Sequence, residues 1–171
     1  DLRGTNEAVT STGTAAVANV NDLPTGAITI SGTPTQNQTL TVINTLADVD
    51  GLGAMSYQWK ANGEAIGGQT GTTLVLGQAQ VGKVITVTAS YTDGQSTAEA
   101  VTSTGTASVA NVNDVPTGVV TITGTATQGQ TLTAANTLAD VDGLGEISYQ
   151  WKANGEAISG QTGATLVLGQ T

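Results

Sequence analysis

Apolar and polar residues alternate with a period of two along most of the chain, as they do in strands that bury one face. Met55, Tyr57 and Trp59 share one face of such a stretch, and Asn62-Gly63 just after it is a strong signal for a two-residue hairpin. The predicted strands are Ala27–Ser31, Thr39–Leu46, Met55–Lys60, Glu64–Ile66, Thr72–Leu76, Val84–Tyr91 and Glu99–Val112. About seven strands with turn signals between them and no helical period predict a β-sandwich.

The chain repeats itself at an offset of 92 residues. When Asp1–Ala79 is aligned with Asp93–Thr171, 61 of 79 positions are identical. A period near 92 suits a sandwich domain and is too long for solenoid repeats. We therefore predict an all-β fold of tandem immunoglobulin-like β-sandwich repeats. Residues 1–20 are predicted to be the last strand of a preceding repeat, residues 21–113 a complete repeat, and residues 114–171 the front part, about five strands, of the next.

The ends of the chain fit a longer array. Asp1-Leu2-Arg3-Gly4 is neither an initiator methionine nor the start of a signal peptide, so we expect a fragment or a processed product. A tryptophan inside an alternating third strand, as at Trp59, is typical of immunoglobulin-like cores. The chain has no cysteine, so the disulfide that usually packs on this tryptophan is absent.

Composition narrows the classes of function. Thirteen acidic residues face four basic ones, a net charge of −9, which argues against nucleic acid and anionic membranes as partners and suits cations. No apolar run is long enough to insert into a membrane. Without histidine or cysteine most nucleophile–base pairs are impossible, and paired carboxylates of a glycosidase type would lie in turns with no evident cleft. We predict that the protein is not an enzyme.

The acidic residues lie mainly in turns, and the segment Thr45–Gly53, with its Asp-Val-Asp-Gly core, recurs unchanged as Thr137–Gly145. In a sandwich of this topology the loop after the second strand, the loop after the sixth strand and the incoming linker share one pole. The acids there should therefore converge. The candidate metal ligands are Asn21, Asp22, Asp48, Asp50, Asp93 and Glu99 around the first loop, Asn113, Asp114, Asp140 and Asp142 around the second, and, as further candidates, Asp1, Glu7 and Glu64.

Calcium is the ion that such a cluster would favour. Converging carboxylates without lysine or arginine repel one another, and calcium accepts six to eight oxygen ligands from carboxylates, amides and backbone, whereas magnesium suits an all-protein cage poorly. An EF-hand is excluded, because position 12 counted from Asp48 is Trp59. The alternative is that Asp-Gly pairs simply make turns, and for Glu64 a solvated hairpin charge is the preferred interpretation. Because Asp140 and Asp142 have no Asp93 counterpart in the chain, the first loop should be the better-formed site.

The linker Val17–Thr25, repeated at Val109–Thr117, resembles the inter-repeat linker of bacterial cadherin-like and immunoglobulin-like repeats. Together with the Ala-Asp-Val-Asp-Gly-Leu-Gly loop, the Ser-Tyr-Gln-Trp strand and the Ala-Ser-Tyr-Thr-Asp segment, the whole chain resembles repeats of giant secreted adhesins of the RTX type. The resemblance implies an extracellular or bacterial cell-surface location and an extender role, with calcium at the domain junctions stiffening the array.

The predicted function is thus a structural extender or stalk segment whose partners are neighbouring repeats of the same chain or copies of itself. Two alternatives stay open. One is a self-assembling extracellular filament subunit whose ends complete each other's sandwiches. The other is a glycan-binding or protein-binding adhesin module, although the paired Trp and Tyr residues fit core packing better than a sugar platform.

Overall fold

The computed structural model describes residue 4 and residues 6–169, and these form β-strands and loops with a single 3₁₀ turn, η1 (Gln78–Gln80). The strands of the first repeat are β1 (Ile28–Ser31), β2 (Thr39–Asn44), β3 (Ser56–Ala61), β4 (Glu64–Ala65), β5 (Thr73–Val75), β6 (Ile85–Thr92) and β7 (Ala98–Thr102). Those of the second are β8 (Val120–Thr123), β9 (Thr131–Asn136), β10 (Lys152–Ala153), β11 (Glu156–Ala157) and β12 (Thr165–Val167). The all-β prediction is confirmed.

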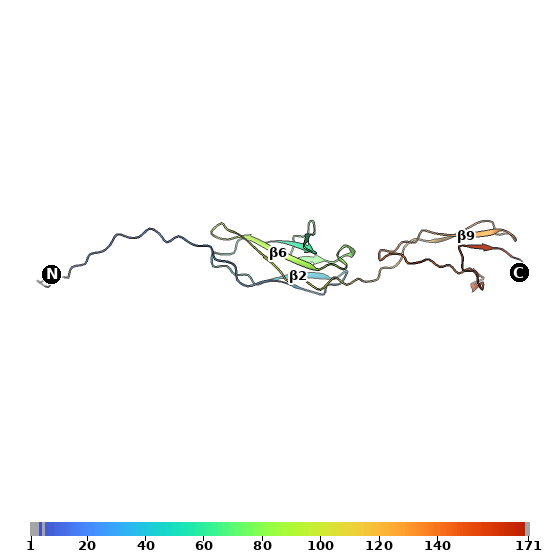
Figure 1. Cartoon of the computed structure of the whole chain (residues 1–171), viewed down its shortest axis with the longest axis horizontal. Coiled ribbons are helices and arrows are strands. Elements are labelled where there is room, and N and C mark those ends of the chain that lie inside the picture. The colour runs from blue at the N-terminus through green and yellow to red at the C-terminus, as the bar shows by residue number, and fades with distance from the viewer. Residues whose placement is uncertain (1–3, 5, 170–171) are drawn as a thin grey trace. The chain divides into compact units, whose positions relative to one another are not determined.

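The first repeat has two antiparallel sheets. One has the strand order β1-β2-β5 and the other β4-β3-β6-β7, and β2 and β6, labelled in Figure 1, belong to different sheets. The register pairs Trp59 of β3 with Val87 of β6. The hairpin between β3 and β4 turns at Asn62-Gly63, where both residues have positive φ (49° and 86°), as a type I′ turn requires.

The core of the first repeat follows the alternation in the sequence. Ile85, Val87, Ala89 and Tyr91 all point inward from β6 and are 0–5% exposed. Trp59 is fully buried, and its indole N–H donates to the carbonyl oxygen of Gly71 at 2.9 Å. A buried indole with its one donor satisfied anchors the core without a desolvation penalty.

Two compact units divide the chain, and their boundaries differ from those of the repeats. The first unit is Asp1–Gly32, Leu40–Leu74 and Ile85–Thr106, and the second is Thr33–Thr39, Val75–Val84 and Ala107–Thr171. The loops 33–39 and 75–84 fall into the second unit because they hydrogen-bond with the segment that precedes the second repeat. Gln36 N–H, for example, donates to Ala110 O at 2.9 Å, and Gly82 N–H donates to Val109 O at 2.9 Å.

The second repeat contains one three-stranded sheet, β12-β9-β8, and the short hairpin β10-β11. Residues 148–151 lie outside strands, although their counterparts 56–59 belong to β3. The predicted first strand of the chain, within residues 1–20, is likewise not formed at residues 6–20, whereas its counterpart 98–102 is β7. Both β3 and β7 pair with β6, so these sequences form strands where a β6 lies beside them.

The predicted final strand, Glu99–Val112, is shorter in the structure and ends at Thr102. Beyond it, side-chain hydroxyls replace backbone carbonyls as hydrogen-bond acceptors. Val87 N–H donates to Ser103 Oγ, and Ile85 N–H donates to Thr106 Oγ1, both at 3.1 Å. Local competition from Ser and Thr side chains therefore interrupts the ladder.

Candidate functional site

The Asp-x-Asp-Gly turn has the same local structure in both repeats. Asp50 N–H donates to Asp48 Oδ1 at 2.9 Å and Gly51 N–H to Asp48 O at 3.1 Å, while Gly51 has φ +94°. In the second copy, Asp142 N–H donates to Asp140 Oδ1 at 2.9 Å and the glycine has φ +99°. The first aspartate thus makes an Asx turn and the glycine supplies a backbone conformation that side chains disfavour.

In the first unit this turn contacts the loop between β6 and β7, as the topology argument predicted. Gly94 N–H donates to Asp50 O at 3.0 Å. Gly53 lies so close to the end of β6 that a Cβ atom at this position would be 1.9 Å from Thr92 O. Glycine at position 53 is therefore required for close approach of the two loops, independently of any ligand.

The first linker, Val17–Thr25, also reaches the turn. Asp22 N–H donates to Asp50 Oδ2, and Asn19 Nδ2 donates to Asp50 Oδ1, both at 2.8 Å. Asn21 Nδ2 donates to Glu99 Oε1 at 3.0 Å. The structure thus brings Asn21, Asp22, Asp50 and Glu99 to one pole of the first repeat.

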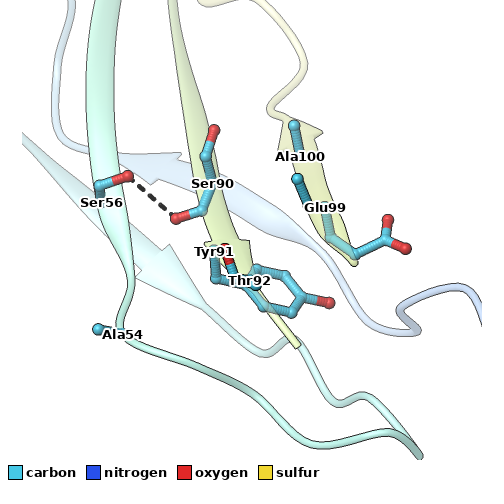
Figure 2. A pocket seen from close by; sticks show the side chains of 8 residues that line it. Ala54, Ser56, Ser90, Tyr91, Thr92, Glu99 and Ala100 are labelled. Atoms are coloured by element: carbon cyan, nitrogen blue, oxygen red, sulfur yellow. Dashed lines mark hydrogen bonds between the residues drawn. The ribbon is translucent and has the colours of Figure 1, made fainter. Parts of the chain in front are cut away.

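Tyr91, at the end of β6, connects the core to this pole. Its hydroxyl donates to Asp48 Oδ2. Burial, the hydrogen bond to Asp48 and the negative charges of Asp48, Glu99 and Asp93 raise the pKa of Tyr91 well above its usual value. Tyr91 and Glu99, both labelled in Figure 2, line a shallow hollow of about 390 Å³. Its other lining residues are small, among them Ala54, Ser56 and Ser90. Tyr91 is therefore hydrogen-bonded to one carboxylate and lies in the negative field of two others.

Asp93 is the most buried acid of the candidate site, with only 6% of its surface exposed. Its Oδ1 accepts the N–H groups of Gln95 at 2.9 Å and Thr97 at 2.7 Å. Its Oδ2 is buried and has no hydrogen-bond partner. An unpartnered buried carboxylate oxygen is costly, so it favours a further ligand.

In the second unit, Asp142 is held in the same way as Asp50. Its Oδ2 accepts Asp114 N–H at 2.7 Å, and its Oδ1 accepts Asn111 Nδ2 at 2.9 Å and Gln78 Nε2 at 3.4 Å. The backbone N–H of Asp114, followed by the amides of Asn111 and Gln78, lowers the pKa of Asp142. The other amide atom of Gln78, Oε1, is buried without a partner.

The acids ahead of this turn are bonded to amides as well. Asp114 Oδ2 accepts Gln36 Nε2 at 3.0 Å, and Asn113 Nδ2 donates to Asp114 O at 2.8 Å. Glu7 is exposed, Glu64 is exposed in β4, and Asp1 lies outside the described residues. Among the residues that the structure describes, Glu7 and Glu64 therefore do not belong to the hydrogen-bonded cluster at the pole.

The oxygen atoms at both poles are of the type that a hard cation binds, because they belong to carboxylates and amides. Among the residues that the structure describes, however, no group of three or more acidic side chains lies close enough to hold a metal ion. Amide N–H groups occupy most of the carboxylate oxygens instead. Among the described side chains, Asp93 Oδ2 and Gln78 Oε1 are the buried oxygens without a hydrogen-bond partner, one at each pole. A cation would therefore replace some of these amide contacts.

The sequence analysis missed the amides and the phenol that bind these acids: Asn19, Gln36, Gln78, Tyr91 and Asn111. The repeat itself could have pointed to some of them, because Asn19 recurs as Asn111 and Gln36 recurs as Gln128 at the offset of 92 residues. An uncharged residue in a near-identical repeat does not stand out, however, and its acceptor lies up to 78 positions away.

No protein-family model matches the chain, and comparison with curated proteins finds no match either. The assignment of function therefore depends on the repeat, the fold and the chemistry of the two poles. Within the described part of the chain no helix is long and apolar enough to cross a membrane.

Proposed function

We propose that this chain is a structural extender segment of a secreted bacterial adhesin, in which calcium at the junctions between repeats stiffens the array. The supporting observation is that the same contacts join linker and turn in both repeats. Asp22 N–H donates to Asp50 Oδ2 at 2.8 Å, and Asp114 N–H donates to Asp142 Oδ2 at 2.7 Å. A contact repeated at each junction is what an array of defined geometry requires.

Calcium is favoured as the ion by the unsatisfied oxygens. At the first pole Tyr91 donates to Asp48 and lies in the negative field of Glu99 and Asp93, and Asp93 Oδ2 has no partner. At the second, Gln78 Oε1 lacks a partner beside Asp142. A cation at either pole would relieve the repulsion between carboxylates and the cost of these buried oxygens.

The role is tested by chelation of the whole chain. The melting temperature and the maximum dimension from solution scattering are measured with calcium and with excess EDTA. Calcium is expected to raise the melting temperature and to narrow the distribution of chain dimensions seen by scattering. Asp48→Ala or Asp50→Ala should reduce both effects. Glu64→Gln, at an exposed position, is the control. Unchanged values with and without EDTA would refute the calcium role.

A self-assembling filament subunit is the second candidate, favoured by one observation. In the second repeat Val120 and Ile122 of β8 are 54% and 62% exposed, and with Tyr149 and Trp151 they line a small cavity of about 90 Å³. Residues 6–20 of another copy correspond to β7, and β7 pairs with β6. The second repeat has no counterpart of β6 in this chain, so these residues alone would not complete it. Growth of sedimentation coefficient with concentration would favour this candidate over the extender.

A further inference from the structure

Gln36 is a buried amide with both ends of its side chain engaged. It is 4% exposed, its Oε1 accepts Val112 N–H at 2.9 Å, and its Nε2 donates to Asp114 Oδ2 at 3.0 Å. Both partners belong to the second linker, Val109–Thr117. When the oxygen and the nitrogen of one buried amide both hydrogen-bond to the same segment, they hold that segment in a defined register.

The side chain of Gln36 continues a backbone ladder between its own loop and the linker. Thr35 and Ala110 form a parallel bridge, Gln36 N–H donates to Ala110 O at 2.9 Å, and Ala110 N–H donates to Pro34 O at 2.8 Å. Val109, one residue earlier, is only 2% exposed. The backbone bonds end at Ala110, and Gln36 extends the attachment to Asp114, which in turn bonds to Asp142.

We propose that Gln36 is an amide latch that orders the second linker whether or not a metal ion is bound. Its contacts need no cation, because a neutral amide donates to the Asp114 carboxylate directly. The latch therefore acts at the junction of the proposed function but does not depend on calcium. It implies that chelation leaves the linker attached at Val112 and Asp114.

The chain contains its own control for this proposal. Gln128 occupies the position of Gln36 in the second repeat, and it is exposed. Gln36→Leu removes both side-chain bonds, whereas Gln36→Glu keeps an acceptor for Val112 N–H and sets a second carboxylate opposite Asp114. Gln128→Leu makes the same chemical change as Gln36→Leu at a position without these contacts.

The test is amide hydrogen exchange of Val112 and Asp114 by NMR, in EDTA, in the whole chain. In wild type and Gln128→Leu both amides are expected to be protected. In Gln36→Leu the exchange of Val112 should accelerate about fivefold, since a lost hydrogen bond is worth roughly that factor. In Gln36→Glu, Val112 should stay protected more than in Gln36→Leu, while Asp114 exchanges faster than in wild type. Unchanged exchange of the β6 amides shows that each variant is folded.

Two results would overturn the latch. One is a Val112 amide that is unprotected in wild type in EDTA, and the other is equal protection in Gln36→Leu and Gln128→Leu. Repeating the measurement with calcium separates this inference from the proposed function. If calcium changes nothing but Gln36→Leu still exposes Val112, the calcium role fails and the latch stands. If calcium protects the linker equally in wild type and Gln36→Leu, and EDTA abolishes that protection in both, the latch fails and the calcium role stands.

Discussion

The two repeats have nearly the same sequence and differ in how much of it becomes sheet. Residues 56–61 form β3 and pair along their length with β6, while of the counterparts 148–153 only Lys152 and Ala153 are in a strand. The turns do not differ: the Asx turn at Asp48 and the one at Asp140 have matching bonds. Turns are thus encoded locally, whereas the third strand depends on a partner distant in the sequence.

Side chains of the second repeat are also less buried than their counterparts in the first repeat, where more strands are paired. Leu40 of β2 is fully buried and Ile28 of β1 is 3% exposed, while their counterparts Leu132 and Val120 are half-buried and 54% exposed. Trp151 is still 6% exposed, and its indole N–H still bonds to Gly163 O at 2.9 Å. The local surroundings of each tryptophan therefore persist in the second repeat, although the sheet that contains Trp59 in the first repeat has only the short hairpin β10-β11 as its counterpart.

The largest expected effect compares the two leucines. Leu40→Ala should destabilise the first repeat by about 2–5 kcal/mol, because it leaves a cavity in a closed core, and Leu132→Ala should cost less than about half of that. Urea unfolding followed by resolved NMR signals of β6 and β9 separates the two repeats. Equal losses would contradict the difference in packing between them.

Much of the fold was predictable because it depends on short-range patterns. The inward face of β6 at Ile85, Val87, Ala89 and Tyr91 follows from alternation, and the Asn62-Gly63 hairpin from its turn chemistry. The length of the last strand was not predictable in this way. Thr106 has good strand propensity. The hydroxyls of Ser103 and Thr106, however, compete for the N–H groups of β6.

The candidate site was predictable in its location but not in its bonding. Loop topology brought Asp50 close to Gly94 and Asp22, as expected from the order of strands. That Asn19 and Gln36 would satisfy the carboxylates of Asp50 and Asp114 depends on side-chain reach across 31 and 78 residues of sequence. No spacing rule within the sequence reports such distant pairs.

A smaller effect is expected from Asp93→Asn, a change that affects the first repeat alone because the second repeat has no equivalent residue in this chain. Asparagine keeps an Oδ1 acceptor for Gln95 and Thr97, so in EDTA the variant should unfold at the wild-type temperature or slightly above. With calcium at 100 times its Kd, wild type should gain about 2.7 kcal/mol, and the variant should lose most of that gain. Thermal unfolding of wild type and Asp93→Asn, in EDTA and in calcium, measures this gain in stability.

Glu64→Gln, which changes an exposed acid of the same repeat, is the control for Asp93→Asn. It should retain the full calcium gain. If Asp93→Asn retained it as well, Asp93 would not be a calcium ligand.

The smallest effect concerns acid, at the exposed Asp142. Its pKa is lowered in the folded chain, so its contribution to stability is present above the unfolded value of about 4 and is lost as the pH falls through the folded value. Exchange of the Asp114 amide should therefore quicken in this acidic range, after correction for intrinsic rates. Asp142→Asn should remove this pH dependence, and Glu146→Gln, at an exposed acid nearby, should leave it unchanged. The same pH dependence in both variants would assign it to another group.

The central claim, that calcium binds where linker and turn meet, is tested most directly by a crystal structure of the chain grown with calcium. We predict an ion at the first pole, with Asp93 Oδ2 and a carboxylate oxygen of Asp48 or Asp50 among ligands at about 2.3–2.6 Å. Density that shows only water there, with the Asn19 and Asp22 bonds to Asp50 intact, would contradict the claim.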